Sequence, residues 1–174
     1  MRLQAPAIVA LSLLLAGSLA ACRQPWRAFS PENGRFSVQL PGNPEERQLT
    51  LETSAGPAEA HVFGVMVNRY PWDTVGGFCA VTYADMPVGL ERQQAISEAR
   101  SRILSELDGT VEEEAEIAEG DAPGVDLMGR TSTGRVFHAR IFLHEGRIFE
   151  LVAMGDREFV QKAEEAFFPS FEIG

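Results

Sequence analysis

Gly34–Pro44, with the sequence GRFSVQLPGNP, is the stretch from which the fold is best inferred. Phe36, Val38 and Leu40 alternate with polar residues, as they do in a strand that buries one face. Pro41-Gly42 follows at once and predicts a turn that ends the strand. The folded part of the chain therefore opens with a half-buried β-strand.

Three more strands are predicted before residue 90. Leu49 and Leu51 indicate the first of them. Residues 61–70 are apolar on both faces, which is typical of a central strand covered on two sides. Residues 77–83 predict the third, which ends near Met86-Pro87.

The apolar period changes between Leu90 and Leu107 from that of a strand to that of a helix. Charged residues, Arg102 and Glu106 among them, lie largely off the apolar stripe, and Asp108-Gly109 supplies a stop. We expect an amphipathic helix packed on a sheet. Its stripe consists of Ile96, Ala99, Ile103 and Leu107.

The last third of the chain returns to strands. Residues 111–117 form a weak, acidic strand or a loop, and Pro123-Gly124 opens three strands separated by residues 132–134 and a tight Glu145-Gly146 turn. A short helix with Asp156 as its cap follows. The predicted fold class is α+β, an antiparallel sheet sandwiched by helices.

Three segments resemble the PsbP-like superfamily: Gly34–Pro44, Pro123-Gly124 before a strand, and the closing Phe167-Phe168-Pro169-Ser170-Phe171. This superfamily includes extrinsic photosystem II proteins, Mog-type import factors that bind Ran, and many bacterial lipoproteins. The resemblance spans about residues 29–173. It implies one α/β/α sandwich domain over 29–174 with a non-enzymatic binding or assembly role. It transfers no catalytic residue, and neither photosystem nor Ran binding.

The first 22 residues carry a targeting signal. Arg2 precedes an uncharged run, residues 5–21, that is shorter than the roughly 20 residues needed to cross a bilayer. The run ends in Leu19-Ala20-Ala21-Cys22, which resembles the lipobox of bacterial lipoproteins. We expect 1–21 to be a cleaved signal peptide, Cys22 to be lipidated and 22–28 to be a short tether. The alternatives are an ordinary secretory signal with a chance cysteine, or a buried apolar helix.

Lipidation predicts a location in the cell envelope. At about 0.8 kcal/mol per buried methylene, two or three acyl chains such as palmitate make a durable anchor. Arg23, rather than Asp, follows the cysteine. By analogy with the enteric sorting rule, this favours the periplasmic side of the outer membrane if the source is Gram-negative.

Composition limits the partners. The chain has a net charge of -10, and loss of Arg2 with the signal makes it more acidic still. This charge disfavours nucleic acid and anionic lipid. With Cys22 acylated, Cys79 has no partner for an internal disulfide, and a small buried hydrophobe is the favoured interpretation of it.

The search for reactive groups predicts no enzyme, no cofactor and no metal. The three histidines, His61, His138 and His144, lack the close Cys, Asp or His spacing of a metal site, and there is no CxxC pair. The acidic residues between 112 and 121 could attract calcium or a basic partner. They lack the pattern of a calcium loop, so a solvated acidic segment is the simpler interpretation.

One strand face is a candidate binding surface. His138, Arg140, Phe142 and His144 alternate, so they would share one face and form a basic and aromatic patch for a carboxylate or a partner. The alternative is an ordinary solvated sheet face. Glu150 would lie opposite Ile141 across the hairpin, either as a pocket acid, or at an edge, or through an error of register.

The expected function is that of a membrane-anchored scaffold or binding module for an unidentified envelope protein. A durable anchor, a compact domain and no recognisable chemistry support this expectation. The alternative is a carrier of a small apolar ligand or lipid, which the 11 phenylalanines would favour.

Overall fold

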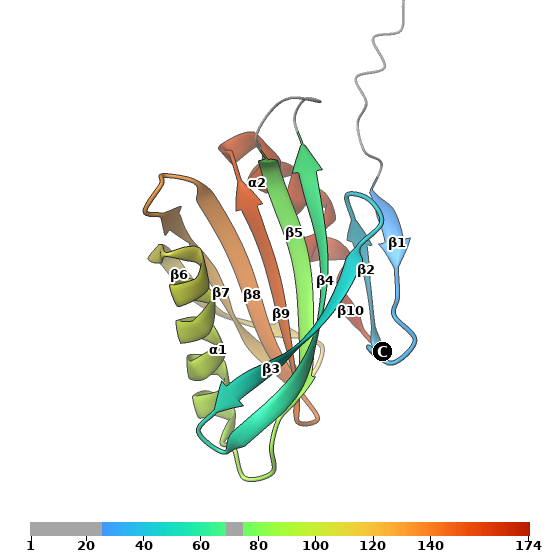
Figure 1. The fold of residues 1–174 in the computed structure, drawn as a ribbon, viewed down its shortest axis with the longest axis vertical. Coiled ribbons are helices and arrows are strands. Elements are labelled where there is room, and N and C mark those ends of the chain that lie inside the picture. Colours follow the sequence, from blue (N-terminus) through green and yellow to red (C-terminus); the bar gives the residue numbers. More distant parts are fainter. Residues whose placement is uncertain (1–25, 69–74) are drawn as a thin grey trace, which may run out of the picture.

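The computed structural model describes residues 26–68 and 75–174. Within these ranges the chain forms a seven-stranded antiparallel sheet, a separate three-stranded sheet and two α-helices (Figure 1). The elements are β1 (Arg27–Phe29), β2 (Phe36–Leu40), β3 (Glu45–Thr53), β4 (Gly56–Asn68), β5 (Val75–Asp85), α1 (Arg92–Leu107), β6 (Gly109–Glu119), β7 (Ala122–Thr131), β8 (Val136–His144), β9 (Arg147–Gly155), α2 (Arg157–Ala166), the 3-10 turn η1 (Phe168–Ser170) and β10 (Glu172–Ile173).

The large sheet has the order β3-β4-β5-β9-β8-β7-β6. Two antiparallel meanders, β3 to β5 and β6 to β9, meet where β5 pairs with β9. Helix α1 connects them and carries the chain from the middle of the sheet to its far edge. This order places β3 and β6 at the two edges.

Helix α1 covers part of one face of the sheet. Ala95, Ala99 and Ile103 are buried against apolar residues such as Phe137 and Ile141. The predicted stripe is confirmed at Ala99 and Ile103, while Ile96 and Leu107 are only partly buried. Asp108 takes the left-handed conformation and its N–H reaches the carbonyls of Leu104 and Ser105, so the predicted stop is confirmed.

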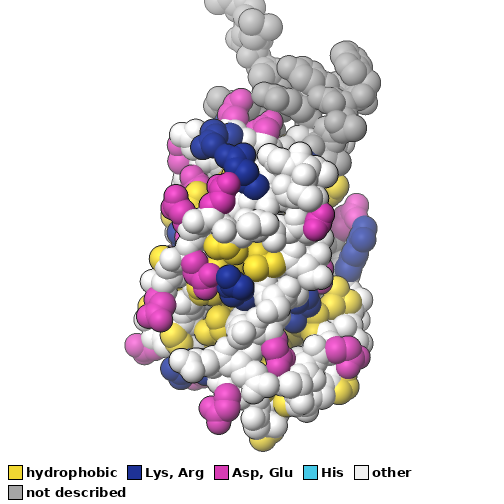
Figure 2. All heavy atoms as spheres, turned by 90° about the vertical axis from the view of Figure 1, so that its left-hand side faces the viewer, with side chains coloured by type: hydrophobic (Ala, Val, Ile, Leu, Met, Phe, Trp, Pro, Cys, Tyr) yellow, Lys and Arg dark blue, Asp and Glu magenta, His cyan; other side chains and the backbone are white. Residues whose placement is uncertain are grey.

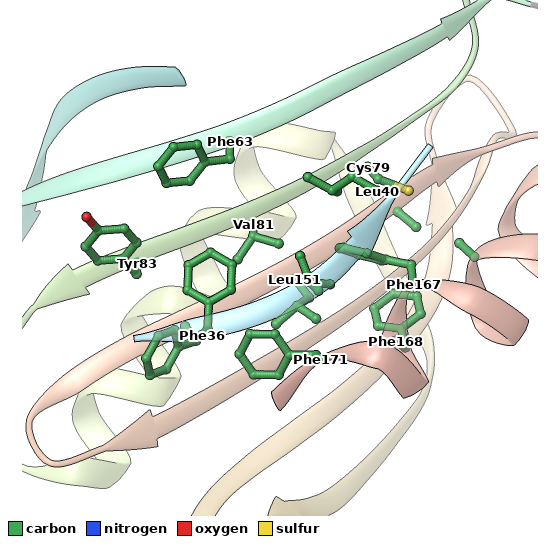
Figure 3. Close-up of a cluster of buried hydrophobic side chains, with 14 of the residues drawn as sticks. Phe36, Leu40, Phe63, Cys79, Val81, Tyr83, Leu151, Phe167, Phe168 and Phe171 are labelled. Atoms are coloured by element: carbon green, nitrogen blue, oxygen red, sulfur yellow. The ribbon is translucent and has the colours of Figure 1, made fainter. Parts of the chain in front are cut away.

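The opposite face carries a phenylalanine-rich core (Figure 3). β2 lies across this face and points Phe36, Val38 and Leu40 into the core. Helix α2 and η1 cover the rest, and Asp156 caps α2 by accepting a hydrogen bond from Phe159 N at 2.8 Å, as predicted. This core includes Phe63, Val81, Leu151 and Phe171 (Figure 3).

Two parts of the predicted architecture need correction. The sheet lies between α1 on one face and α2 together with the β1-β2-β10 sheet on the other, so helices alone do not sandwich it. Arg27 and Ala28, assigned above to the tether, belong to β1 and pair with Leu40 and Gln39.

The acidic segment after α1 is a complete edge strand, β6, with a bulge between Val111 and Glu113. Its glutamates are exposed except Glu119, which is partly buried, and Glu112 and Glu114 are paired to Arg130 and Arg100. Charged side chains and bulges are common devices that keep edge strands from pairing with other chains.

None of the helices within residues 26–68 and 75–174 has the length and apolar composition needed to span a membrane. The predicted signal peptide and Cys22 lie outside the described residues.

Candidate functional site

Helix α1 leaves part of its sheet face uncovered. It packs over β8, β6, β7 and β9, whereas on this face no helix lies over the upper parts of β4 and β5. Met66 on β4 is 59% exposed, and both its cross-strand partner Phe78 and Val62, further along β4, are only partly buried. A Cβ at Gly64 would meet nothing within 4 Å. The middle of this face is therefore an open apolar surface.

Two adjoining hollows occupy the space between α1 and β3, with volumes of about 440 and 170 Å³. They share Leu49, Leu51, Arg102 and Glu106, so we treat them as one site, the α1–β3 groove. On the left-hand side of the molecule as drawn in Figure 1, apolar side chains are gathered in the middle with charged ones around them (Figure 2). The groove is lined by Leu49, Thr50, Leu51, Glu52, Ser54, Val62, Phe78, Ala80, Thr82, Ser97, Glu98, Ser101, Arg102, Ile103, Glu106, Leu107, Glu150 and Val152.

A buried ion pair lies in the groove. Glu150 on β9 is 5% exposed and accepts a hydrogen bond from Arg102 Nη2 on α1. Burial raises the pKa of Glu150 to about 7, although Arg102 opposes the shift and Glu106 adds to it. Glu150 pairs with Ile141 as predicted, and it is the pocket acid among the three alternatives.

The rim of the groove is acidic. Glu52 and Glu106 are exposed, and Glu98 accepts hydrogen bonds from Ser54 N at 3.3 Å and from Gln94 at 3.2 Å. Hydrogen bonding by Ser54 lowers the pKa of Glu98, so its carboxylate stays charged. Four carboxyl groups thus line the groove against the single guanidinium of Arg102.

The face predicted to carry His138, Arg140, Phe142 and His144 lies beneath α2 and η1. His138 is 4% exposed, its ring stacks on Phe168 at 4.1 Å, and its Nε2 lies 2.8 Å from Asp126 Oδ1. Arg140 Nε donates to the same oxygen at 2.6 Å. The structure thus brings His138 and Arg140 together on one carboxylate.

The other two residues of that face lie apart from this cluster. Phe142 is buried and stacks on Phe171, with ring centroids 5.7 Å apart. His144, at the end of β8, lines a hollow of only about 40 Å³ with Arg35 and Arg147. The four residues therefore do not form one continuous surface patch.

Asp126 is the centre of the His138 cluster. Burial alone would raise its pKa, but the hydrogen bonds with His138 and Arg140 outweigh burial and hold the pKa below its usual value. His138 Nδ1 lies 3.3 Å from Glu164 Oε1 without the geometry of a hydrogen bond. The cluster links β7, β8 and α2, so its charged groups hold these elements together.

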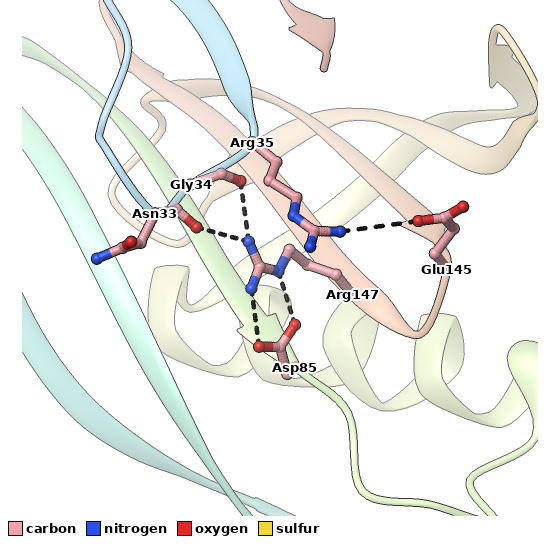
Figure 4. Close-up of polar contacts among 6 residues, drawn as sticks. All are labelled: Asn33, Gly34, Arg35, Asp85, Glu145 and Arg147. Atoms are coloured by element: carbon pink, nitrogen blue, oxygen red, sulfur yellow. Dashed lines mark hydrogen bonds and ion pairs between the residues drawn. The ribbon is translucent and has the colours of Figure 1, made fainter.

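A second polar cluster joins the turn before β2 to the main sheet (Figure 4). Arg147 donates to both oxygens of Asp85 and to the carbonyls of Asn33 and Gly34, at 2.6 to 3.2 Å. Its guanidinium also lies 4.8 Å from the ring centre of Tyr83. Arg147 thus acts as a clamp, by which we mean that one side chain hydrogen-bonds to both the large sheet and the turn that leads into the small sheet.

Within the described ranges, the reactive side chains do not come together as a metal site or around an activated nucleophile. No group of three or more His, Cys, Asp or Glu side chains there is placed to hold a metal ion. Cys79 on β5 is completely buried, and burial raises the pKa of its thiol far above the usual range. A thiol of this kind is a poor nucleophile.

The Arg102–Glu150 pair was not predicted from the sequence, which placed Arg102 only off the apolar stripe of its helix. One signal was available: Glu150 interrupts the apolar run from Ile148 to Met154. The partnership of the two residues depends on how α1 lies over β9, which no local pattern specifies.

No protein-family model and no curated protein sequence matches the chain. The solution structure of cyanobacterial PsbP (CyanoP) from Synechocystis sp. PCC 6803 is similar, with a TM-score of 0.58, 9% identity, and coverage of 87% of this chain and 94% of that one. The protein of unknown function PA94 from Pseudomonas aeruginosa matches with a TM-score of 0.39 and 11% identity, covering 80% and 89%. The first comparison shows that the fold is PsbP-like, as the sequence resemblance implied.

Proposed function

We propose that this chain is a lipid-anchored, extracytoplasmic module that binds and scaffolds envelope proteins without catalysing a reaction. The observation that carries the proposal is the α1–β3 groove, in which partly exposed apolar side chains of the main sheet lie open between α1 and β3. Open apolar surfaces bordered by polar groups are characteristic of protein interaction sites.

The proposed anchor at Cys22 supports this role through its distance from the domain. Trp26 packs against the phenylalanine-rich core, so the path from Cys22 to the folded domain is at most roughly 14 Å at about 3.5 Å per residue. A lipid on Cys22 would hold the domain near the bilayer surface. We place the protein in the cell envelope, on the periplasmic side of the outer membrane in a Gram-negative cell.

The buried charges support a non-enzymatic role. Asp126 is engaged by His138 and Arg140, and Glu150 is engaged by Arg102. In both clusters a carboxylate is paired with a cation from another strand or helix, as is expected of groups that hold elements of the fold together.

A carrier of a small apolar ligand or lipid is the second candidate. The 170 Å³ hollow favours it, because Val62, Phe78 and Val152 give that space an apolar lining. Sites that enclose a whole ligand usually measure about 300–1,000 Å³, and the larger hollow here is open and acidic. A protein segment that lies along the groove therefore fits the geometry better than an enclosed ligand.

The test separates anchoring from binding. In cells that lack the gene, the wild-type chain is compared with a Cys22→Ser version secreted by a conventional signal peptide. We expect the secreted version to fold, to leave the membrane fraction and to fail to restore the phenotype. Full complementation by this form would overturn the proposal. Lipid extraction and native mass spectrometry of the mature protein test the carrier, which predicts a bound apolar molecule.

A further inference from the structure

We infer that the α1–β3 groove binds a basic amphipathic segment of a partner protein, with apolar side chains on the groove floor and lysines or arginines at its rim. This inference rests on the proposed function and adds the chemistry of the partner.

The floor requires an apolar contact surface. Val62, Phe78 and Val152 line it from three adjacent strands, and Leu49 extends it on β3. Met66, the cross-strand partner of Phe78, extends this apolar floor beyond the hollows toward the end of β4. Each apolar Å² removed from water contributes about 25 cal/mol, so covering this surface is favourable for any partner that fits.

The rim selects the sign of the partner's charge. Glu52, Glu98 and Glu106 border the groove, while its one cation, Arg102, is already engaged by Glu150. An anionic segment would meet three carboxylates with no free positive group in the lining. A lysine or arginine on the partner would instead pair with Glu106 or Glu98 beside the apolar floor.

The charge of the chain decides between a different protein and a second copy. The net charge is -10, and the groove lining itself holds four carboxyl groups against one guanidinium. A second copy or an anionic bilayer would bring like charge to this rim. Charge complementarity therefore selects a basic protein segment.

The first experiment compares two synthetic peptides of about 14 residues, roughly four helical turns. Both have leucine at the same positions on one helical face, and one has lysine where the other has glutamate. Binding to the mature full chain in phosphatidylcholine nanodiscs is measured by fluorescence anisotropy, with empty nanodiscs as the blank. We expect the lysine peptide to bind at least about tenfold more tightly, and to lose about tenfold in affinity in about 0.5 M salt, where the Debye length is a few Å.

The second experiment locates the binding. Met66→Ser and Leu49→Ser change exposed floor residues, and Glu106→Gln neutralises an exposed rim carboxylate. Each should weaken the lysine peptide by about fivefold or more, a loss of about 1 kcal/mol. The matched controls are Val88→Ser, in the exposed loop before α1, and Glu172→Gln on β10. Both lie outside the groove lining and should change affinity by less than about twofold.

Three results would overturn the inference: equal affinity for the two peptides, equal losses in groove and control variants, or a dimer that Met66→Ser dissociates in sedimentation. The last would identify a second copy as the occupant. These failures leave the anchoring test untouched, since complementation by the secreted form depends on Cys22 and not on the peptide.

Discussion

Asp85 and Arg147 lie opposite each other on β5 and β9, and the guanidinium donates to both carboxylate oxygens, Nε to Oδ1 at 2.6 Å and Nη2 to Oδ2 at 2.8 Å. The hydrogen bonds from Arg147 hold the pKa of Asp85 below its usual value. Because Arg147 Nη1 also donates to the carbonyls of Asn33 and Gly34, one side chain fixes both the centre of the large sheet and the turn that leads into β2.

Arg147→Lys should therefore destabilise the domain. Lysine cannot donate in the same planar arrangement, so at least one of the four hydrogen bonds is lost, and we expect a decrease of about 1–3 kcal/mol in the free energy of unfolding. Urea unfolding followed by circular dichroism measures it. Arg35→Lys is the control, because the 3.8 Å Arg35–Glu145 pair is about 70% exposed on both sides and should contribute little. Equal effects of the two variants would show that Arg147 is not a clamp.

Glu150 should make stability depend on pH. The folded pKa is raised to about 7, above an unfolded value of about 4.3, so the folded state binds one more proton between these values. This contribution to stability is complete below about pH 4.3 and is lost as pH rises to about 7, by on the order of 3–4 kcal/mol. Glu150→Gln should flatten that slope in urea titrations at pH 5 and pH 7.5. An unchanged slope would contradict the raised pKa.

Asp126→Asn should weaken the contact of α2 and η1 with the sheet. The substitution removes the negative charge that His138 and Arg140 share, and we expect a loss of about 1–3 kcal/mol in urea unfolding. Because the pKa of Asp126 is lowered, its contribution is present above about pH 3.9 and disappears as pH falls through the folded pKa. The control Glu114→Gln removes an exposed partner of Arg100 and should change stability far less. Comparable losses would argue against a special role for Asp126.

Two glycines in neighbouring strands should respond oppositely to alanine. A Cβ at Gly77 would lie 2.3 Å from Phe159 Cδ1. Gly77→Ala therefore forces the Phe159 ring on α2 to move and should lower the free energy of unfolding by about 1–3 kcal/mol. A Cβ at Gly64 meets nothing within 4 Å, and Gly64→Ala should be neutral or slightly stabilising in thermal unfolding. The reverse order would show that the packing of α2 on β5 differs from that described.

Cys79 should be unreactive until the domain unfolds. Its side chain has no exposed area and burial raises the pKa of its thiol, so Ellman's reagent at neutral pH should label no thiol in the folded, lipidated protein. One thiol should react in about 6 M urea. Rapid labelling without denaturant would mean that β5 opens locally or that Cys22 is not acylated.

The local elements could be predicted from the sequence because their patterns are local. The alternation from Phe36 to Leu40 and the helical stripe through Ala99 and Ile103 depend on near neighbours, and each lies where the pattern placed it. β2 was not recognised as part of a second sheet, because a strand that buries one face has the same alternation whether it pairs within the main sheet or lies across it.

The candidate site was harder to predict because it depends on which helix covers which part of each sheet face. The alternation of His138 and Arg140 correctly gave a shared face, but the chain returns from β9 through α2 and Phe168 to cover that face. The open surface lies instead over β4 and β5, where α1 diverges from the sheet. Residues 61–70 were predicted to be covered on both sides, and the partial exposure of Val62 and Met66 shows that one side is open.

The β1-β2 pairing has a mechanical consequence for a domain held by its N-terminus. A force applied along the chain from Cys22 would enter through β1, whose three residues pair with β2 and leave the seven-stranded sheet untouched. The shortest strand on the path would detach first, while Arg147 and the buried side of β2 would resist. Detachment would add the three residues of β1, roughly 10 Å at about 3.4 Å per residue, to the free chain between Cys22 and the folded domain, while the seven-stranded sheet stays folded.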